Sequence, residues 1–330
     1  MIKYWQQTEG QLHNVSKEDI EKGKRLWVDA RNVTQSEIKQ IQSEYGIDQE
    51  LIMDMMDPDE LSRIEDWSDY NSAIMRLPVF NPNSSVSYTT APIGLAIFKD
   101  TIVTICWTDC EVLRDISANR IKGLSLGDFP AFIIRILARA DTMFLRYLKE
   151  INRRTNSIQN ELDDQIENAE LIQLLNIQKS LTFFTTSLKS NQLLLEKIRK
   201  TRILKIDSDD QEWLDDVEVD NRQAMEMADT YSQITEGIMD AFANVISNNM
   251  NEVMKKLTVI SLVLMIVSAI TSFWGMNIRL PFSNSVNTDD WRGLIFIIIF
   301  CATSATFAYS IMTYNPFKKL FGRKKRKGRK

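Results

Sequence analysis

The sequence predicts an N-terminal α/β domain followed by long stalk helices and two C-terminal helices that can cross a membrane. Three observations support this fold class. Short β-type runs alternate with helical patterns over residues 1–127, a region that holds four of the seven prolines. No proline occurs between Pro130 and Pro281, which is typical of long helices. Two long apolar runs lie near the C-terminal end of the sequence.

In the α/β domain, runs of β-branched and aromatic residues predict strands, and two periodic runs predict helices. The short Lys99-Asp100 connection indicates a hairpin. The region has no Gly-rich phosphate loop and no GxSxG motif, so nothing in it indicates an enzyme. The predicted strands span residues 25–30, 72–80, 93–98 and 101–107, and the predicted helices span 35–45 and 49–56.

Long helices are predicted over residues 128–256. Asp128 before Phe129-Pro130 is expected to cap the first of them. Apolar residues recur at helical spacing up to Ile151 and again over residues 171–198, as in a helical bundle or coiled coil. The break between these helices lies within residues 156–168. A further helix is expected to begin near Trp213 and to continue into the first apolar run.

Residues 207–220 contain eight acidic and no basic residues. Two interpretations are open. The stretch is either a solvated linker that caps the positive end of the next helix, or a low-affinity sensor of divalent cations, because carboxylates suit hard cations that keep much of their water.

The first apolar run is uncharged over residues 257–274, which corresponds to ~27 Å of helix against a hydrocarbon core of ~30 Å. A short outer loop (278–292) leads to a second run at residues 293–314. A basic tail, residues 315–330, follows, and residues 318–330 contain nine Lys and Arg and no acid. This charge favours placement of the tail on the cytoplasmic side, and it favours contact with anionic lipid over contact with nucleic acid. We therefore expect a multi-pass protein of the cell (inner) membrane with both termini in the cytoplasm and no cleavable signal peptide.

Polar and small residues form a stripe along the helix that ends in the first apolar run. No aliphatic or aromatic residue interrupts this 3.5-residue spacing, which keeps one face toward a common axis. Membrane helices also use such faces for ordinary packing, but the stripe is rich in hydroxyl groups and favours a pore. Two helices cannot enclose a wet path, so a pore requires several copies. The stripe comprises Asp240, Asn244, Ser247, Asn251, Met254, Thr258, Ser261, Met265, Ser268, Ser272 and Gly275.

Soft metal ligands are scarce in this sequence. It contains one histidine, His13, and three cysteines, Cys106, Cys110 and Cys301. This odd number argues against a disulfide framework, and the set is too small for a histidine and cysteine metal site. Cys106 and Cys110 are expected to be buried thiols.

Gly275-Met276-Asn277 ends the first of two C-terminal membrane helices and follows NEVMKKLTVI at residues 251–260. This arrangement resembles the CorA family of magnesium channels and transporters. The resemblance implies a homopentameric funnel in which Gly275, Met276 and Asn277 form the selectivity filter and Asp240 lies at the cytoplasmic mouth. The implied regulatory metal residues are Asp54 and Asp216. The implied pore-lining residues are Asn251, Met254, Leu257, Thr258, Ser261, Met265 and Ser268.

The N-terminal resemblance rests on Leu26-Trp27-Val28-Asp29 and on residues 51–70. Three positions depart from the family pattern: Trp274 replaces a tyrosine, Met53 replaces an acid before Asp54, and Arg279 lies where the outer loop usually carries an acid nearby. The resemblance implies influx of Mg²⁺, with Co²⁺ and Ni²⁺ as further candidate ions, gated by intracellular Mg²⁺. The alternatives are a zinc transporter of the same superfamily and a membrane-anchored scaffold without ion flux.

Overall fold

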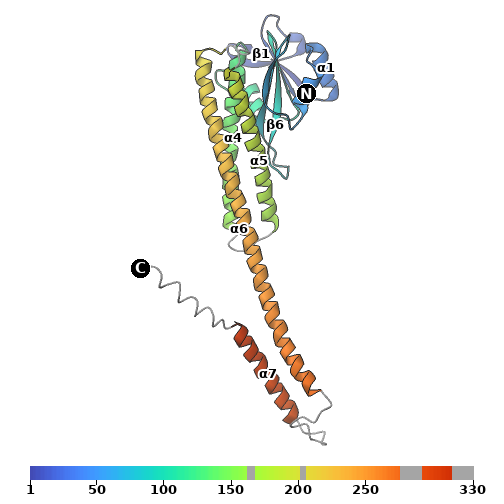
Figure 1. Cartoon of the computed structure of the whole chain (residues 1–330). Helices are drawn as coiled ribbons and strands as arrows, with labels where there is room; N and C mark the ends of the chain where they lie inside the picture. The colour runs from blue at the N-terminus through green and yellow to red at the C-terminus, as the bar shows by residue number, and fades with distance from the viewer. Residues whose placement is uncertain (162–167, 201–205, 276–291, 314–330) are drawn as a thin grey trace, which may run out of the picture. The chain divides into compact units, whose positions relative to one another are not determined.

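The computed structural model describes residues 1–161, 168–200, 206–275 and 292–313. The N-terminal region, coloured from blue to cyan in Figure 1, forms a seven-stranded sheet, and the strand order is β2-β1-β3-β7-β6-β5-β4. The β3–β7 pair is parallel, and the other neighbouring pairs are antiparallel. The strands are β1 (Ile2–Thr8), β2 (Gln11–Val15), β3 (Leu26–Arg31), β4 (Arg63–Asp66), β5 (Asn71–Phe80), β6 (Tyr88–Ile97) and β7 (Thr101–Cys106).

The predicted hairpin is confirmed as β6–β7, because Phe98 N donates to Thr101 O over 2.8 Å across the Lys99-Asp100 turn. Strands β5 and β6 each contain a proline. Pro78 lies beyond the end of β4, and Pro92 lies beyond the end of β7, so each strand has a neighbour on one side only at that position. An open strand edge is where a sheet tolerates proline.

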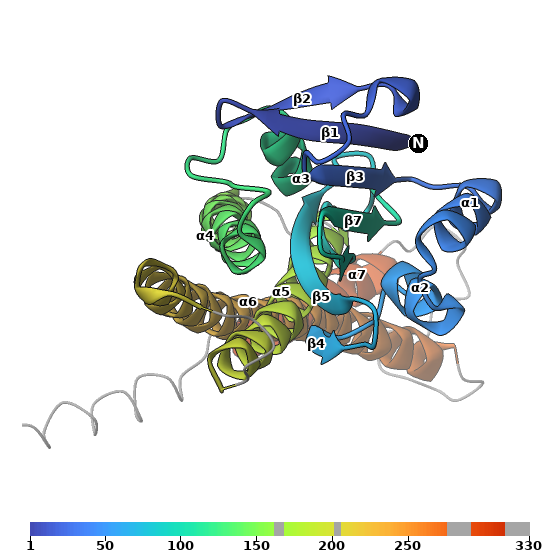
Figure 2. The same ribbon diagram turned by 90° about the horizontal axis from the view of Figure 1, so that it is seen from above.

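Helices cover both faces of the sheet. On one face, α1 (Gln35–Tyr45) and α2 (Gln49–Met56) match the predicted helices and bury Ile41, Leu51 and Met55 in the core. A capping box between Thr34 and Glu37 begins α1. On the other face, Trp27 contacts Phe132 edge-on, with ring centroids 6.2 Å apart. Figure 2 shows α1 and α2 on one side of the sheet and α3 (Glu111–Ser117) and α4 (Phe129–Glu161) on the other.

Four elements of this domain have no counterpart in the sequence-based prediction: β1, β2, β4 and α3. Strands β1 and β2 lie at one edge of the sheet, and each contains a few buried residues among exposed polar ones. Strand β4 has only four residues, and α3 has seven. Segments this short or this polar lack the periodicity that identifies an element.

The predicted long helices are confirmed as α4, α5 (Asn168–Lys200) and α6 (Ser208–Trp274), and α7 (Arg292–Thr313) follows. Helix α6 has 67 residues and begins before the predicted start at Trp213. Asp128 caps α4, since its Oδ1 accepts from Ala131 N over 3.1 Å. Asp207 caps α6, since its Oδ1 accepts from Asp210 N over 2.8 Å. The predicted cap is therefore present at the first residue of the acidic stretch, but the predicted linker is wrong, because residues 208–220 lie inside α6.

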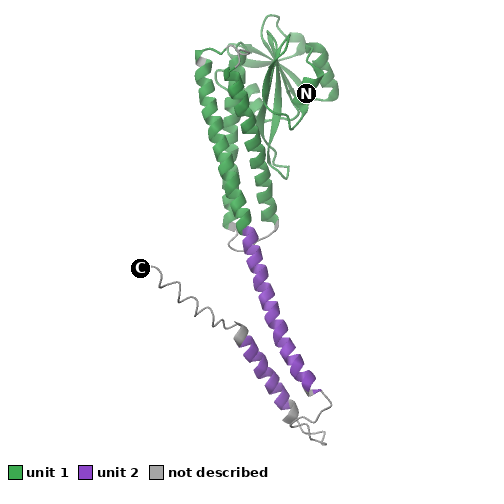
Figure 3. Cartoon of the chain, in the orientation of Figure 1, with its two compact units in different colours: residues 1–241 green, residues 242–330 purple. Residues whose placement is uncertain are grey.

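The chain divides into two compact units, residues 1–241 and 242–330 (Figure 3). Unit 1 holds the sheet, α1 to α5 and the first part of α6. Unit 2 holds the remainder of α6 and α7. The division at residue 241 lies inside a continuous helix. The finer boundaries predicted at residues 127 and 256 remain predictions.

Candidate functional site

The predicted stripe lies on one continuous helix. Its members from Asp240 to Ser272 belong to α6, and Gly275 lies in the turn that follows, where its N–H donates to Thr271 O over 3.0 Å. Met276 and Asn277 lie outside the described residues, as do Arg279 and the basic segment 315–330. The helix therefore brings the predicted pore-lining residues into line, whereas the position of the predicted filter stays a prediction.

The side chains of the stripe are exposed in the single chain. Met254 and Met265 of the stripe expose 53% and 63% of their surface, and Leu257, which the resemblance adds to the pore lining, exposes 56%. Apolar residues off the stripe are exposed as well, with Val253 at 60% and Leu264 at 61%. The part of the stripe in unit 2 and these two apolar residues are therefore exposed, whereas another face of the helix is partly buried and includes Val263, Ile266 and Val267.

The hydroxyl of Thr258 donates to Met254 O over 2.8 Å. Its proton is therefore engaged with the helix, and its oxygen can act only as an acceptor toward the stripe. Thr271 makes the same kind of bond, to Val267 O and Ser268 O over 3.1 and 3.0 Å, but lies off the stripe. An acceptor without a free proton suits the waters of a hydrated cation, because these waters are donors.

Among the described residues, one helix is long and apolar enough to cross a membrane, and this is α6. Helix α7 contains a shorter apolar stretch, Ile295–Ser310. The predicted second crossing at residues 293–314 corresponds to α7, which has 22 residues, and it remains a prediction.

Asp54 lies near the end of α2, where Arg63 of β4 neutralises it. The Arg63 guanidinium contacts Asp54 Oδ2 over 2.6 Å and Glu65 Oε1 over 3.1 Å, and it also pairs with Glu60. Partial burial lowers the pKa of Arg63, but its hydrogen bond to Asp54 and the fields of Glu60 and Glu65 raise it overall. The predicted regulatory carboxylate therefore already has a cationic partner within its own chain.

Asp216 is exposed on α6 in the predicted acidic stretch. Two of its neighbours, Asp215 and Glu218, pair with Arg199 of α5 over 2.5 and 2.9 Å. The stretch is thus partly neutralised by a basic residue from another helix, and the sequence of the stretch alone does not reveal this.

A group of three carboxylates was not predicted from the sequence. The carboxylate oxygens of Asp128, Asp207 and Asp210 lie within 4.8 Å of one another, so they could hold a metal ion. Asp128 was predicted as a cap, and Asp207 and Asp210 belong to the acidic stretch interpreted as a capping linker or a divalent cation sensor; the N-terminal ends of α4 and α6 bring the three together. The local sequence does not indicate that residues so far apart along the chain lie close together in the fold.

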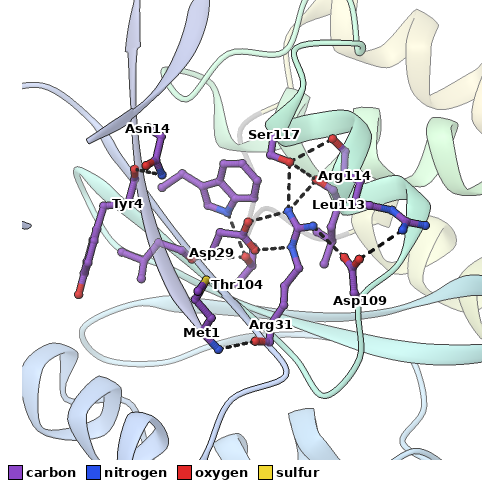
Figure 4. A network of polar contacts seen from close by, with 12 residues as sticks. Met1, Tyr4, Asn14, Asp29, Arg31, Thr104, Asp109, Leu113, Arg114 and Ser117 are labelled. Atoms are coloured by element: carbon purple, nitrogen blue, oxygen red, sulfur yellow. Dashed lines mark hydrogen bonds and ion pairs between the residues drawn. The ribbon is translucent and has the colours of Figure 1, made fainter. Parts of the chain in front are cut away.

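The N-terminal strand of the resemblance has a structural role. Asp29 on β3 is buried and pairs with Arg31 over 2.6 Å, and Arg31 also contacts Asp109 over 2.9 Å (Figure 4). Cys106 and Cys110 are buried free thiols, as predicted. Burial raises the pKa of both thiols, that of Cys106 to about 12. Both are therefore protonated near neutral pH.

Comparisons with known proteins agree with this architecture. The cobalt/magnesium transport protein CorA of Methanocaldococcus jannaschii is 25% identical over 291 residues, which cover 84% of this chain and 87% of that protein. The complete structure of the CorA magnesium transporter from the same organism matches with a TM-score of 0.74 at 19% identity, covering 95% of this chain and 96% of that one.

The cytoplasmic domain of ZntB from Vibrio parahaemolyticus matches less well, with a TM-score of 0.55 at 11% identity, over 76% of this chain and 98% of that one. At these identities the solved structures show a shared fold. A family model described as CorA-like Mg²⁺ transporter protein matches residues 22–319, which is most of the sequence. The chain therefore belongs to the CorA-like Mg²⁺ transporter family.

Proposed function

We propose that this protein is a homo-oligomeric channel that conducts Mg²⁺ into the cell down its electrochemical gradient. The observation that carries the proposal is the polar stripe, which runs from Asp240 to Ser272 on α6, the helix long and apolar enough to cross a membrane. By resemblance the channel is a pentamer in the cell membrane with both termini in the cytoplasm, and its basic tail contacts lipid.

The ion would pass with its hydration shell. Mg²⁺ gives up its waters reluctantly, so a ring of Asn277 amides would select the hydrated ion through hydrogen bonds rather than by stripping it. Thr258, whose oxygen acts as an acceptor, would receive hydrogen bonds from the same waters. A membrane potential supplies about 4.6 kcal/mol per 100 mV for a divalent cation.

Internal Mg²⁺ would regulate the channel through Asp54 and Asp216, which by resemblance meet across a subunit boundary. Bound Mg²⁺ would hold the closed state, with Met254 and Leu257 as an apolar constriction. When internal Mg²⁺ falls, repulsion between the carboxylates would loosen the ring. The Asp54 carboxylate must exchange Arg63 for Mg²⁺ in this scheme, because the 2.6 Å ion pair occupies it.

Uptake of Mg²⁺ by the purified protein in liposomes tests the proposal. Asn277→Ala is expected to abolish selective uptake. Asn284→Ala, in the same predicted outer segment but outside the Gly-Met-Asn tripeptide, is expected to leave it intact. If the unaltered protein carries no ion flux, the chain is a membrane-anchored scaffold and the proposal fails.

The zinc-transporter alternative draws on the shared fold with ZntB. Most groups along the described part of the stripe are hydroxyl, amide and carboxylate oxygens, which suit Mg²⁺ better than Zn²⁺, and its only sulfur groups are the thioethers of Met254 and Met265. Competition in the same liposomes separates the two ions. Faster uptake of Zn²⁺ than of Mg²⁺ at equal concentration would favour the zinc alternative.

A further inference from the structure

Asp141 and Asn221 form a buried polar contact between two long helices of unit 1. Asp141 lies on α4 and Asn221 lies on α6, and both side chains are fully buried. Asn221 Nδ2 donates to Asp141 Oδ1 over 3.1 Å. A buried aspartate is usually paired with a cationic side chain, whereas the partner of Asp141 in this contact is a neutral amide.

Each residue keeps one polar atom without a partner. Asp141 Oδ2 and Asn221 Oδ1 are buried and make no hydrogen bond among the described residues. Both atoms are acceptors if Asp141 is ionised, so neither can satisfy the other. A buried acceptor left unpaired is unfavourable, and a buried charge with one neutral hydrogen bond is more so.

The electrostatic surroundings also oppose a charge on Asp141. The charged group whose field acts on it is Asp220, next to Asn221 on α6, and this field is repulsive. On α4 itself, Arg139 is committed to Asp115 over 2.5 Å and Arg146 to Glu111 over 2.9 Å. Asp115 shows the contrast, because it is equally buried but pairs with both Arg139 and Arg120.

We propose that Asp141 is a proton-binding site: a neutral carboxylic acid whose Oδ2–H donates to Asn221 Oδ1. A planar acid and a planar amide joined by one hydrogen bond can form a second in the opposite direction when the acid carries a proton. One proton from solvent then satisfies both orphaned atoms, and the reciprocal pair fixes α6 against α4. This chemistry does not depend on the proposed function.

The proposal gives unit 1 a defined pH dependence. In the unfolded chain Asp141 ionises near its ordinary pKa of about 3.9, whereas burial raises its pKa in the folded chain. Between these two values the folded state holds a proton that the unfolded state has lost. Stability therefore falls as the pH rises through this range, by up to about tenfold in the folding equilibrium constant per pH unit.

Infrared difference spectroscopy of the full-length protein in detergent tests the proposal. The spectrum of the unaltered protein minus that of Asp141→Asn at neutral pH is expected to show the C=O stretch of a protonated carboxylic acid. Asn221→Leu is expected to keep this band but to shift it, because the hydrogen bonds to the acid are lost. Asp115→Asn is the matched control and should leave the band in place, since ion-paired Asp115 contributes a carboxylate.

A second measurement is the thermal unfolding midpoint of the unaltered protein and of Asp141→Asn as a function of pH. Asp141→Asn keeps the size and shape of the side chain. Its unfolding midpoint relative to that of the unaltered protein is expected to rise as the pH rises. A difference spectrum with a carboxylate band instead of an acid band would overturn the proposal. So would a shift of that carboxylate band on chelation of Mg²⁺, which would assign Asp141 Oδ2 and Asn221 Oδ1 to a metal ion.

Discussion

Replacing Arg63 by glutamine is expected to make the protein more sensitive to internal Mg²⁺. Arg63 contacts Asp54 over 2.6 Å, and the two side chains are 26% and 36% exposed. A pair this accessible to solvent is worth about 1 kcal/mol at most. In the proposed regulation Mg²⁺ must displace this contact to bind Asp54, so removal of the contact should lower the Mg²⁺ concentration for half-inhibition by about fivefold. Freeing Glu60 and Glu65 from the same guanidinium acts in the same direction.

The assay is Mg²⁺ uptake by liposomes loaded with graded internal Mg²⁺. Lys17→Gln is the matched control, because Lys17 forms a surface pair of equal length with Glu44, 2.6 Å, and makes no contact with Asp54 among the described residues. Asp54→Ala should shift the inhibition curve in the opposite direction from Arg63→Gln. If Arg63→Gln leaves the curve unchanged, or shifts it as Asp54→Ala does, Arg63 does not compete with Mg²⁺ and the reasoning is wrong.

Three further predictions follow from single contacts. Thr258→Val should slow Mg²⁺ uptake by about fivefold, which corresponds to the free energy of one lost hydrogen bond. Thr271→Val loses a similar bond to the backbone but lies off the stripe, so it should leave uptake unchanged. Equal slowing by the two variants would refute the role of the stripe. Asp207→Ala should destabilise the protein by about 1 kcal/mol through loss of the α6 cap, seen as a lower thermal midpoint than for exposed Glu212→Ala. Burial raises the pKa of Cys106 to about 12, so maleimide should not label this thiol at about pH 8 until the protein unfolds; rapid labelling of folded protein would contradict the buried position.

The sequence predicts the elements that have a strong period and misses those that do not. The ranges of α1 and α2 are correct to the residue because a capping residue and an amphipathic pattern coincide in each. The prolines in β5 and β6 do not exclude strands, because the short neighbours β4 and β7 leave part of each edge open. Whether a strand edge is open at a proline depends on which strands pair and over how many residues, and the local sequence carries no information about this pairing.

The candidate site likewise has features that the sequence predicts and features that it does not. The α6 stripe could be predicted because a single helix contains all of it. The pairing of Asp54 with Arg63 could not, since it depends on how β4 lies beside α2. Asp141 offers a signal that sequence reasoning passed over: it occupies the same helical face as Leu137, Phe144 and Leu148, all of which are buried. An acid on the apolar face of a long helix is expected to be neutral or paired.

The spacing of the stripe also constrains how copies of α6 could associate. Steps of three and four residues from Asp240 to Gly275 average 3.5, so a common axis lined by this face would require a left-handed supercoil. If this seam lines a hydrated path, it cannot pack against a neighbouring copy, and close packing must come from other faces of the helix, because apolar burial does not drive helix association in lipid. The exposed apolar residues off the stripe, such as Val253, Ile260 and Leu264, would have to supply that contact. The seam itself would then be free to remain hydrated, which is what passage of an ion with its water shell requires.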